Sequence, residues 1–178
     1  MLRSAHHLDT LLVEVLVKSS ELQTGSVYLM VGDKGIAAVL RHVYNFQLIF
    51  DNVHFVQAIN TSGIYQQIIH MNSEDAFIAI SFPRYSQSTI KATAYAKKCN
   101  ANVVAITDSV TSPLAAYANE LLIARSDMAS FADSLVAPLS LLNAIIVAVS
   151  ARNKDNIEQT FGKLEKLWEE NQVYKKDV

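Results

Sequence analysis

The sequence predicts an α/β fold, a three-layer αβα sandwich around a five-stranded, mostly parallel sheet. Short apolar runs alternate with longer segments of helical periodicity, which is the pattern of strands joined by crossover helices. The apolar runs are continuous, as in parallel strands that are covered on both faces. The chain has 178 residues, of which 51% are hydrophobic and 18% charged. This length and composition fit one domain with a large core.

The first elements come in the order helix, strand, turn, helix, strand. Residues 1–24 have apolar residues at the spacing of one helical face, which predicts an N-terminal helix. The run VYLMV at 27–31 predicts the first strand, and Gly32–Gly35 form a turn after it. A helix with one apolar side begins at Ile36, and VHFV at 53–56 predicts the second strand.

The pattern repeats in the middle of the chain. A polar helix containing Ile64 and Ile68 leads to the third strand, AFIAI at 76–80. A hydroxyl-rich loop then precedes a helix that should end near Asn100, after two lysines. VVAI at 103–106 predicts the fourth strand.

The C-terminal third contains one more strand and three expected helices. Ser112 followed by Pro113 predicts a helix start, because serine caps helices and proline suits the first helical position. ELLIA at 120–124 predicts the fifth strand. Leu135–Val149 reads as a helix buried in the core or against a second subunit, and residues 153–171 as an amphipathic C-terminal helix.

Five such strands suit the flavodoxin-like order 2-1-3-4-5, in which ligands bind beyond the carboxyl ends of strands 1 and 3. The loops at that point would be Gly32–Gly35 and Ser81–Ser88. The second loop runs into a helix N-terminus, where free N–H groups and the helix dipole favour an anion. We therefore expect the phosphate of a small metabolite to bind there.

Composition argues against several other classes of protein. The net charge is −2, with 15 basic and 17 acidic residues mixed along the chain, so we expect no direct contact with nucleic acid. Cys99 is the single cysteine, which excludes an internal disulfide and suits the cytoplasm. Leu135–Val149 is shorter than the roughly 20 residues of a membrane span, and no signal peptide is visible. We expect a soluble, cytoplasmic protein.

The sequence offers no sign of a metal or an organic cofactor. The five histidines have no metal-ligand spacing. The turn Gly32–Gly35 is too short for a dinucleotide fingerprint and lacks its third glycine. No nucleophile elbow or cysteine–histidine pairing suggests covalent catalysis. We therefore expect neither a metal nor a cofactor.

Three segments together resemble a known family. They are ISFPRYS at 80–86, VVAITDSVTSPLAAYANELLIA at 103–124 and DSLVAPLSLLNAII at 133–146. In combination they are similar to the sugar isomerase (SIS) domain, and more narrowly to that of RpiR-type bacterial transcriptional regulators. The resemblance implies a domain that binds a phosphosugar, a carbohydrate derivative.

The resemblance also implies that effector binding and DNA binding belong to separate domains. RpiR-type regulators carry an N-terminal helix-turn-helix domain that binds operator DNA, whereas only about 25 residues precede the first strand here. We therefore expect residues 1–178 to be a single SIS-type effector-binding domain, with DNA bound only through a helix-turn-helix domain that this chain lacks.

The resemblance and the anion site together predict the ligand-binding residues. They are Gly32, Lys34, Gly35, Ser81, Arg84, Tyr85, Ser86, Ser88 and Ser134. SIS phosphate loops usually show a Ser-x-Ser-Gly-x-Thr run. Here Ser81 matches the first serine, and Pro83, Arg84 and Ser86 replace the second serine, the glycine and the threonine. Lys34 stands where the first loop usually carries a serine.

Each of these residues also has a structural interpretation. The hydroxyls of Ser86 and Ser88 could cap the helix. Arg84 and Lys34 could be solvated loop charges, or could replace lost hydroxyls by charge-assisted contacts to phosphate. Tyr85 could close over a sugar ring or merely cover the loop. Three polar residues after the fourth strand, Thr107, Asp108 and Ser109, suit turn formation and capping.

Sensing and catalysis make different demands on the site. An aldose–ketose isomerase needs a base, and the candidates are Glu74, His54, His70 and Glu120. Both glutamates precede strands, which puts them at the wrong edge of the sheet. The leading interpretation is therefore binding without turnover. A phosphosugar isomerase is the first alternative, and a dimerisation module with a decayed ligand site is the second.

Two apolar features predict a homodimer or higher homo-oligomer. Leu135–Val149 has more apolar surface than one face of a small sheet requires, and the N-terminal helix has a surplus stripe.

Overall fold

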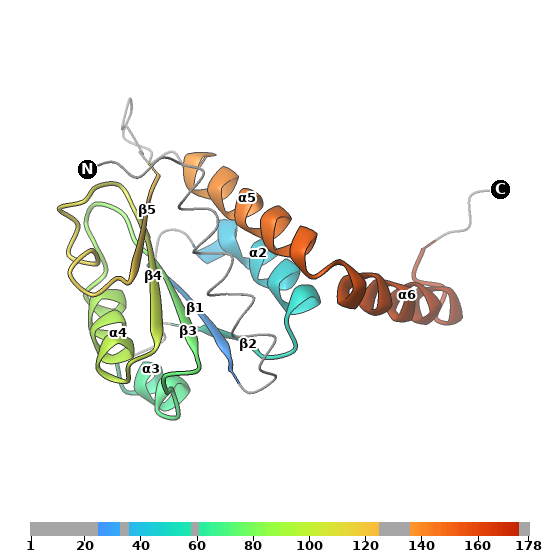
Figure 1. Cartoon of the computed structure of the whole chain (residues 1–178), viewed down its shortest axis with the longest axis horizontal. Coiled ribbons are helices and arrows are strands. Elements are labelled where there is room, and N and C mark those ends of the chain that lie inside the picture. Colours follow the sequence, from blue (N-terminus) through green and yellow to red (C-terminus); the bar gives the residue numbers. More distant parts are fainter. Residues whose placement is uncertain (1–24, 33–35, 58–60, 125–135, 175–178) are drawn as a thin grey trace.

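The computed structural model describes residues 25–32, 36–57, 61–124 and 136–174, and its centre is a sheet of five parallel strands (Figure 1). The strand order is β2-β1-β3-β4-β5. The strands are β1 Val27–Val31, β2 Val53–Val56, β3 Ala76–Ile80, β4 Asn102–Thr107 and β5 Glu120–Ile123. The predicted fold class and strand order are confirmed.

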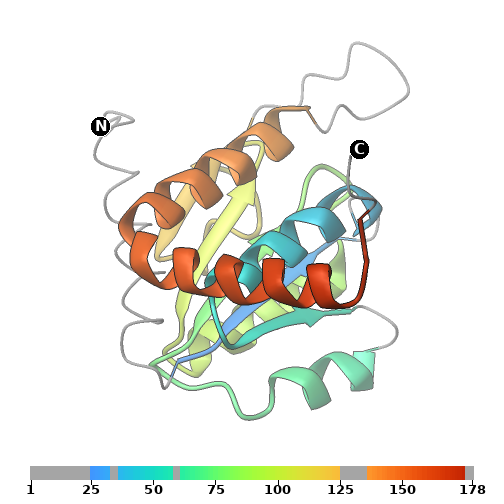
Figure 2. The ribbon, with the colours of Figure 1, turned by 90° about the vertical axis from the view of Figure 1, so that its right-hand side faces the viewer.

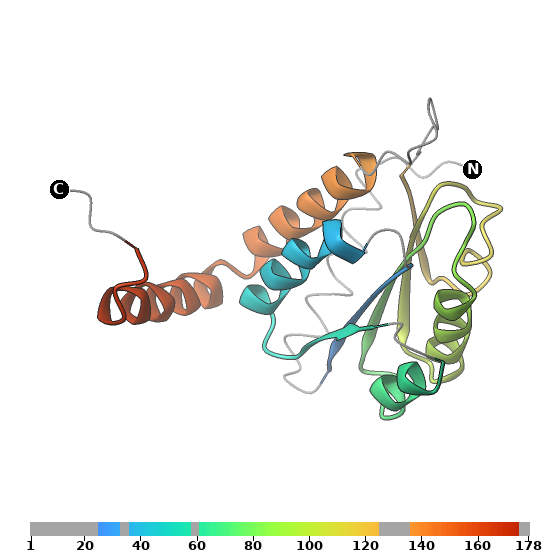
Figure 3. The ribbon, with the colours of Figure 1, turned by 180° about the vertical axis from the view of Figure 1, so that it is seen from behind.

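Helices cover both faces of the sheet (Figures 1 and 3). The helices are α2 Ile36–Ile49, α3 Thr61–Ile68, α4 Gln87–Lys98, α5 Val136–Arg152 and α6 Lys154–Glu170. α2 and α5 lie on one face and α3 and α4 on the other. Figure 2 looks onto the side formed by α2, α5 and α6. α6 bends by 99° from α5, and none of its residues is buried.

The alternation of side chains along each strand divides the core in two. Val27, Leu29 and Val31 of β1 belong to the core under α2 and α5. Tyr28 and Met30 belong to the core under α3 and α4. Because both halves are apolar, the strands read as continuous hydrophobic runs in the sequence.

The predicted end of α4 is confirmed. Asn100 has φ 60°, the left-handed conformation common just after a helix. Its N–H donates to the carbonyl of Lys97, and the Ala101 N–H donates to that of Ala96. These two bonds form a Schellman motif, so the helix ends where the sequence indicated.

The helix predicted from Ser112 is wrong, because the chain forms a series of turns between β4 and β5. Ala115 donates to the carbonyl of Ser112 and Tyr117 to that of Leu114, over three residues rather than four. Asn119 then joins the sheet by donating to Val103. The interval between Ser112 and β5 is too short for a helix that must also return to the sheet edge, so the cap starts only a turn.

Several expectations concern residues outside the described ranges, among them the N-terminal helix of residues 1–24. Among the helices that the structure describes, none is by itself both long and apolar enough to cross a membrane. α5 and α6 together meet the length and composition criteria, but they are separated by the 99° bend.

Candidate functional site

The carboxyl ends of β1 and β3 bring the two predicted ligand loops together. Gly32 follows β1, and its N–H donates to the carbonyl of Ile80 at 2.8 Å. A β-carbon at Gly32 would lie 3.2 Å from the Ser81 Oγ and 3.6 Å from the Ser86 Cβ. The second loop therefore approaches closely, and any larger residue at this position would need the Ser81 side chain to shift. The switch point of the sheet is where the sequence predicted it.

Ser81 anchors the base of the β3–α4 loop. Its side chain is buried, and its N–H donates to the carbonyl of Ile106 on β4. The Ser81 Oγ accepts a long hydrogen bond, 3.4 Å, from the N–H of Ser86. This contact closes the loop between the end of β3 and the start of α4.

The α4 N-terminus has no side-chain cap. Ser86 is the N-cap residue and has an extended backbone, but its hydroxyl makes no capping hydrogen bond. The first turn of α4 contains no acidic residue. The Ser86 hydroxyl therefore does not cap α4. The helix end presents N–H groups and the positive end of its dipole towards the switch point.

Arg84 stands at this helix end with an unusual backbone conformation. Its φ is 65°, in the left-handed region that favours glycine. The side chain is exposed, and no hydrogen bond or ion pair with the described residues engages its guanidinium. Among the described residues, therefore, none neutralises this cation, which lies two residues before the N-cap of α4.

Tyr85 bonds to the residue that follows the neighbouring strand, β4. Its hydroxyl donates to the Asp108 Oδ1 at 2.7 Å. Burial, and then the hydrogen bond and charge of Asp108, raise the pKa of Tyr85 above its usual 10.0. Tyr85 is therefore a protonated donor at neutral pH.

Asp108 has a part in the loop that the sequence did not assign to it. Its place directly after β4, at the same sheet edge as both loops, was visible in the sequence, but turn formation and capping were the favoured roles. Thr107, which is fully buried, also donates to the Asp108 Oδ1 at 3.2 Å. The Thr107 and Ser112 hydroxyls are 2.8 Å apart.

A second residue that the sequence reasoning missed is Thr89 in the first turn of α4. Its hydroxyl is buried and has no hydrogen-bond partner. Buried polar atoms normally have one, so this oxygen is a further unsatisfied polar group near the helix start. Only its position in the first turn could have indicated this.

The structure brings six of the predicted ligand residues to one edge of the sheet. They are Gly32, Ser81, Arg84, Tyr85, Ser86 and Ser88. Lys34, Gly35 and Ser134 lie outside the described residues. A ligand-binding role for all nine remains a prediction.

The candidate catalytic bases lie elsewhere. Glu74 precedes β3 and Glu120 begins β5, so both are at the amino edge of the sheet. His54 stacks on Tyr28 within the sheet face, with ring centroids 4.9 Å apart. His70 is exposed beyond α3. In the described part of the chain, no three histidine, cysteine, aspartate or glutamate side chains form a group that could hold a metal.

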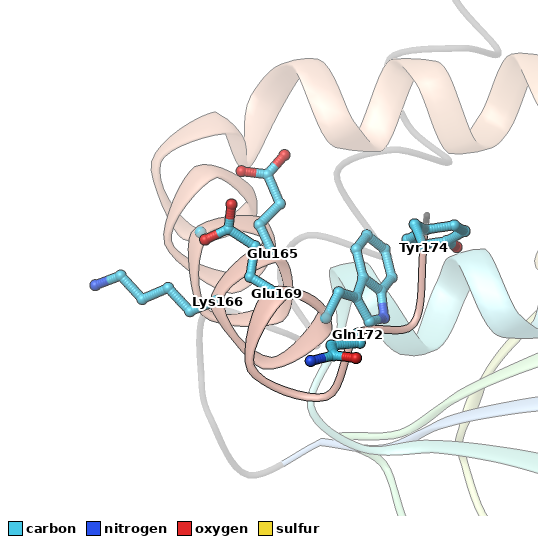
Figure 4. A pocket seen from close by; sticks show the side chains of 7 residues that line it. Glu165, Lys166, Glu169, Gln172 and Tyr174 are labelled. Atoms are coloured by element: carbon cyan, nitrogen blue, oxygen red, sulfur yellow. The ribbon is translucent and has the colours of Figure 1, made fainter. Parts of the chain in front are cut away.

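A separate groove lies along the end of α6 (Figure 4). The residues that line it include Trp168, Gln172 and Tyr174. The rings of Trp168 and Tyr174 pack edge to face, with their centroids 5.3 Å apart. It belongs to the helix that leaves the body of the domain, away from the switch point (Figure 1).

Comparison with known families identifies the domain. The family model of the SIS domain matches residues 33–148. The chain belongs to the SIS domain family. The match includes residues 33–35 of the first ligand loop, the whole second loop and most of α5, which confirms the resemblance seen in the sequence. No curated protein matches the chain.

Solved structures of other SIS domains share this fold. The sugar isomerase domain of an RpiR transcription factor from Sphaerobacter thermophilus superposes with a TM-score of 0.78 at 17% identity, covering 90% of this chain and 86% of that one. NanR of Vibrio vulnificus, solved with ManNAc-6P, has a TM-score of 0.71 at 19% identity. The match covers 91% of this SIS domain and 61% of NanR.

An archaeal protein shares the fold as well. A Methanococcus jannaschii protein, inferred to be a 3-hexulose-6-phosphate isomerase, has a TM-score of 0.63 at 14% identity. The match covers 87% of this chain and 84% of that one. The SIS fold is thus common to regulators and to isomerase-like proteins.

Proposed function

We propose that this SIS domain is the phosphosugar-binding effector domain of an RpiR-type transcriptional regulator, and that it senses a sugar phosphate without converting it. The observation that carries the proposal is the N-terminus of α4 at the switch point, which lacks a side-chain cap and is preceded by Arg84, an exposed residue with no hydrogen-bond or ion-pair partner among the described residues. Helix N-terminal N–H groups and an arginine suit a phosphate dianion.

The rest of the proposed site would contribute through the neighbouring loops. Ser81, Ser86 and Ser88 offer hydroxyls, and Gly32 lets the two loops approach each other closely. Lys34, Gly35 and Ser134 complete the proposed ligand set. SIS regulators among the structural neighbours support this assignment, including NanR solved with ManNAc-6P.

The distribution of carboxylates supports sensing over catalysis. The described residues bring Asp108 to this edge, and its Oδ1 already accepts hydrogen bonds from Tyr85 and Thr107. Glu74 and Glu120 lie at the opposite edge. A base for moving a proton between sugar carbons must reach that proton, so these two are badly placed.

The proposal extends to partners and location. Residues 1–178 would form one domain that acts in the cytoplasm, as the single cysteine suggests. It would work as a homodimer or higher homo-oligomer and affect DNA through a separate helix-turn-helix domain.

Thermal unfolding with ManNAc-6P and glucose 6-phosphate tests the binding proposal, with N-acetylmannosamine and glucose as controls. A phosphosugar at about 100 times its Kd should stabilise the domain by about 2.7 kcal/mol. For a domain of this size that raises Tm by about 5–10 °C. The unphosphorylated sugars should leave Tm unchanged. If no sugar phosphate raises Tm while the protein stays dimeric, the decayed-site alternative is correct.

A phosphosugar isomerase is the second candidate, which the fold shared with the Methanococcus jannaschii protein favours. An isomerase would exchange the C2 proton of an aldose phosphate with solvent. Proton NMR in deuterium oxide, with the same two phosphates, would show loss of that signal or formation of a ketose. We expect neither, and observing either would replace the sensor assignment.

A further inference from the structure

Arg84 is held in a conformation that it would not adopt by itself. Left-handed backbone angles are unfavourable for residues with a β-carbon, and arginine has no side-chain compensation there. Such residues persist where the surrounding structure over-determines them. The φ of 65° at Arg84 therefore calls for contacts that hold the loop on both sides.

One side of the loop is held at its base and the other at its tip. At the base, the Ser81 Oγ accepts from the Ser86 N–H. At the tip, the Tyr85 hydroxyl donates to Asp108 at 2.7 Å, next to Arg84 and across 23 residues of sequence. The second bond is the stronger one, because its acceptor is a carboxylate and both side chains are half-buried.

Asp108 is itself held by a hydrogen-bond network of residues from β4 and the β4–β5 connection. Its Oδ1 accepts from the fully buried Thr107 hydroxyl. The same Thr107 hydroxyl lies 2.8 Å from the buried Ser112 Oγ, so its single proton is shared between these two acceptors, and the Ser112 Oγ accepts from the Leu114 N–H. A continuous network therefore runs from the β4–β5 connection to the residue that follows Arg84.

We propose that Asp108 is a positioning residue of the sugar phosphate site, which acts through Tyr85 to hold Arg84 at the N-terminus of α4. The inference rests on the proposed function for the identity of the ligand. It assigns to the β4–β5 connection a part in phosphate affinity, although Asp108 carries the same sign of charge as the ligand. Breaking the bond releases the strained loop and moves the arginine away from the phosphate.

Binding and local loop opening are measured on the same variants of the full chain. Tyr85→Phe and Asp108→Ala remove the bond, while Asp108→Asn keeps an acceptor oxygen at the same place. Calorimetric titration with ManNAc-6P, and separately with inorganic phosphate, measures affinity. Trypsin cleavage after Arg84, followed by mass spectrometry, measures opening of the loop without any ligand.

We expect about tenfold weaker binding and about tenfold faster cleavage after Arg84 in Tyr85→Phe and in Asp108→Ala. Asp108→Asn should restore most of both properties, and the double variant Tyr85→Phe/Asp108→Ala should be no weaker than either single one. Tyr95→Phe is the matched control, since it removes a phenol hydroxyl from α4, the helix that follows Tyr85, at a weak 3.4 Å contact with the Ile69 carbonyl.

The outcomes separate this inference from the proposed function. If the wild-type protein binds a sugar phosphate, and the variants show the same affinity and the same cleavage rate, Asp108 has no positioning role. The sensor assignment is unaffected by that result. A wild-type protein that binds neither probe nor any hexose phosphate overturns the proposed function, and the positioning role with it. Circular dichroism verifies that each variant is folded.

Discussion

Arg84 explains at the residue scale why phosphate loops of this family usually carry a glycine. The loop turns through a left-handed residue at that position, with φ 65° here. Glycine adopts this conformation without penalty, whereas other residues lose roughly 1–2 kcal/mol. In this chain an unfavourable backbone conformation is accepted at Arg84, and a cation is placed near the proposed phosphate.

Replacing Arg84 therefore has opposite effects on stability and binding. Arg84→Gly should raise the free energy of unfolding by about 1 kcal/mol, because the strain is relieved. It should weaken binding of a sugar phosphate by about tenfold or more, because a charge-assisted contact is lost. Urea denaturation and calorimetric titration measure the two quantities.

Arg84→Ala is the matched control for this prediction. It loses the same charge but keeps the strained backbone, so its stability should not rise. Equal stability of the glycine and alanine variants would contradict the strain argument, whereas unchanged affinity in both would remove Arg84 from the site.

Asp75 joins several elements at the opposite edge of the sheet. Its buried carboxylate accepts from the N–H groups of Ser26 at 2.7 Å and Asn72 at 2.8 Å. Its carbonyl accepts from the N–H of Asn102, where β4 begins. The Asp75 side chain thus holds the chain just before β1 and just before β3. The Asp75 carbonyl holds the start of β4.

Asp75→Ala should lower the free energy of unfolding by about 2–4 kcal/mol, because two N–H groups lose a charged acceptor in a largely buried place. Urea denaturation measures the change. Glu74→Ala is the control, since the neighbouring carboxylate is exposed and should cost less than about 0.5 kcal/mol. Similar losses in both variants would mean that the Asp75 bonds are not what stabilises this edge.

At the scale of the whole molecule, α5 and α6 leave apolar surface uncovered in the single chain. α6 is amphipathic and buries no residue. Phe161 on α6 is 40% exposed, and Val147 on α5 is 67% exposed. A second copy of the chain would cover such a surface, which supports the predicted oligomer.

Light scattering should therefore give the mass of a dimer or larger oligomer at micromolar concentration. Phe161→Glu should shift the protein towards the monomer, because it places a charge in the apolar stripe of α6. Gln159→Glu adds the same charge to an exposed polar position and should have no effect. A monomeric wild-type protein would contradict the prediction.

Much of this architecture could be predicted because it depends on local patterns and on the handedness of the chain. Continuous apolar runs indicated β1, β3 and β4 to within a residue, and five such strands suited the flavodoxin-like order 2-1-3-4-5. The helix predicted at Ser112 failed for a non-local reason. Capping residues favour a helix start, but the chain there must return to the sheet at Asn119.

The sequence by itself determined the parallel sheet, its order and the edge at which two ligand loops meet. Periodicity and turn residues act over short stretches of chain, and five parallel strands joined by helices suit the known doubly wound order. Only the tertiary structure decided that Arg84 takes a left-handed conformation and that Tyr85 bonds to Asp108. That bond joins residues on different loops, and its geometry exists only once β3 and β4 are paired.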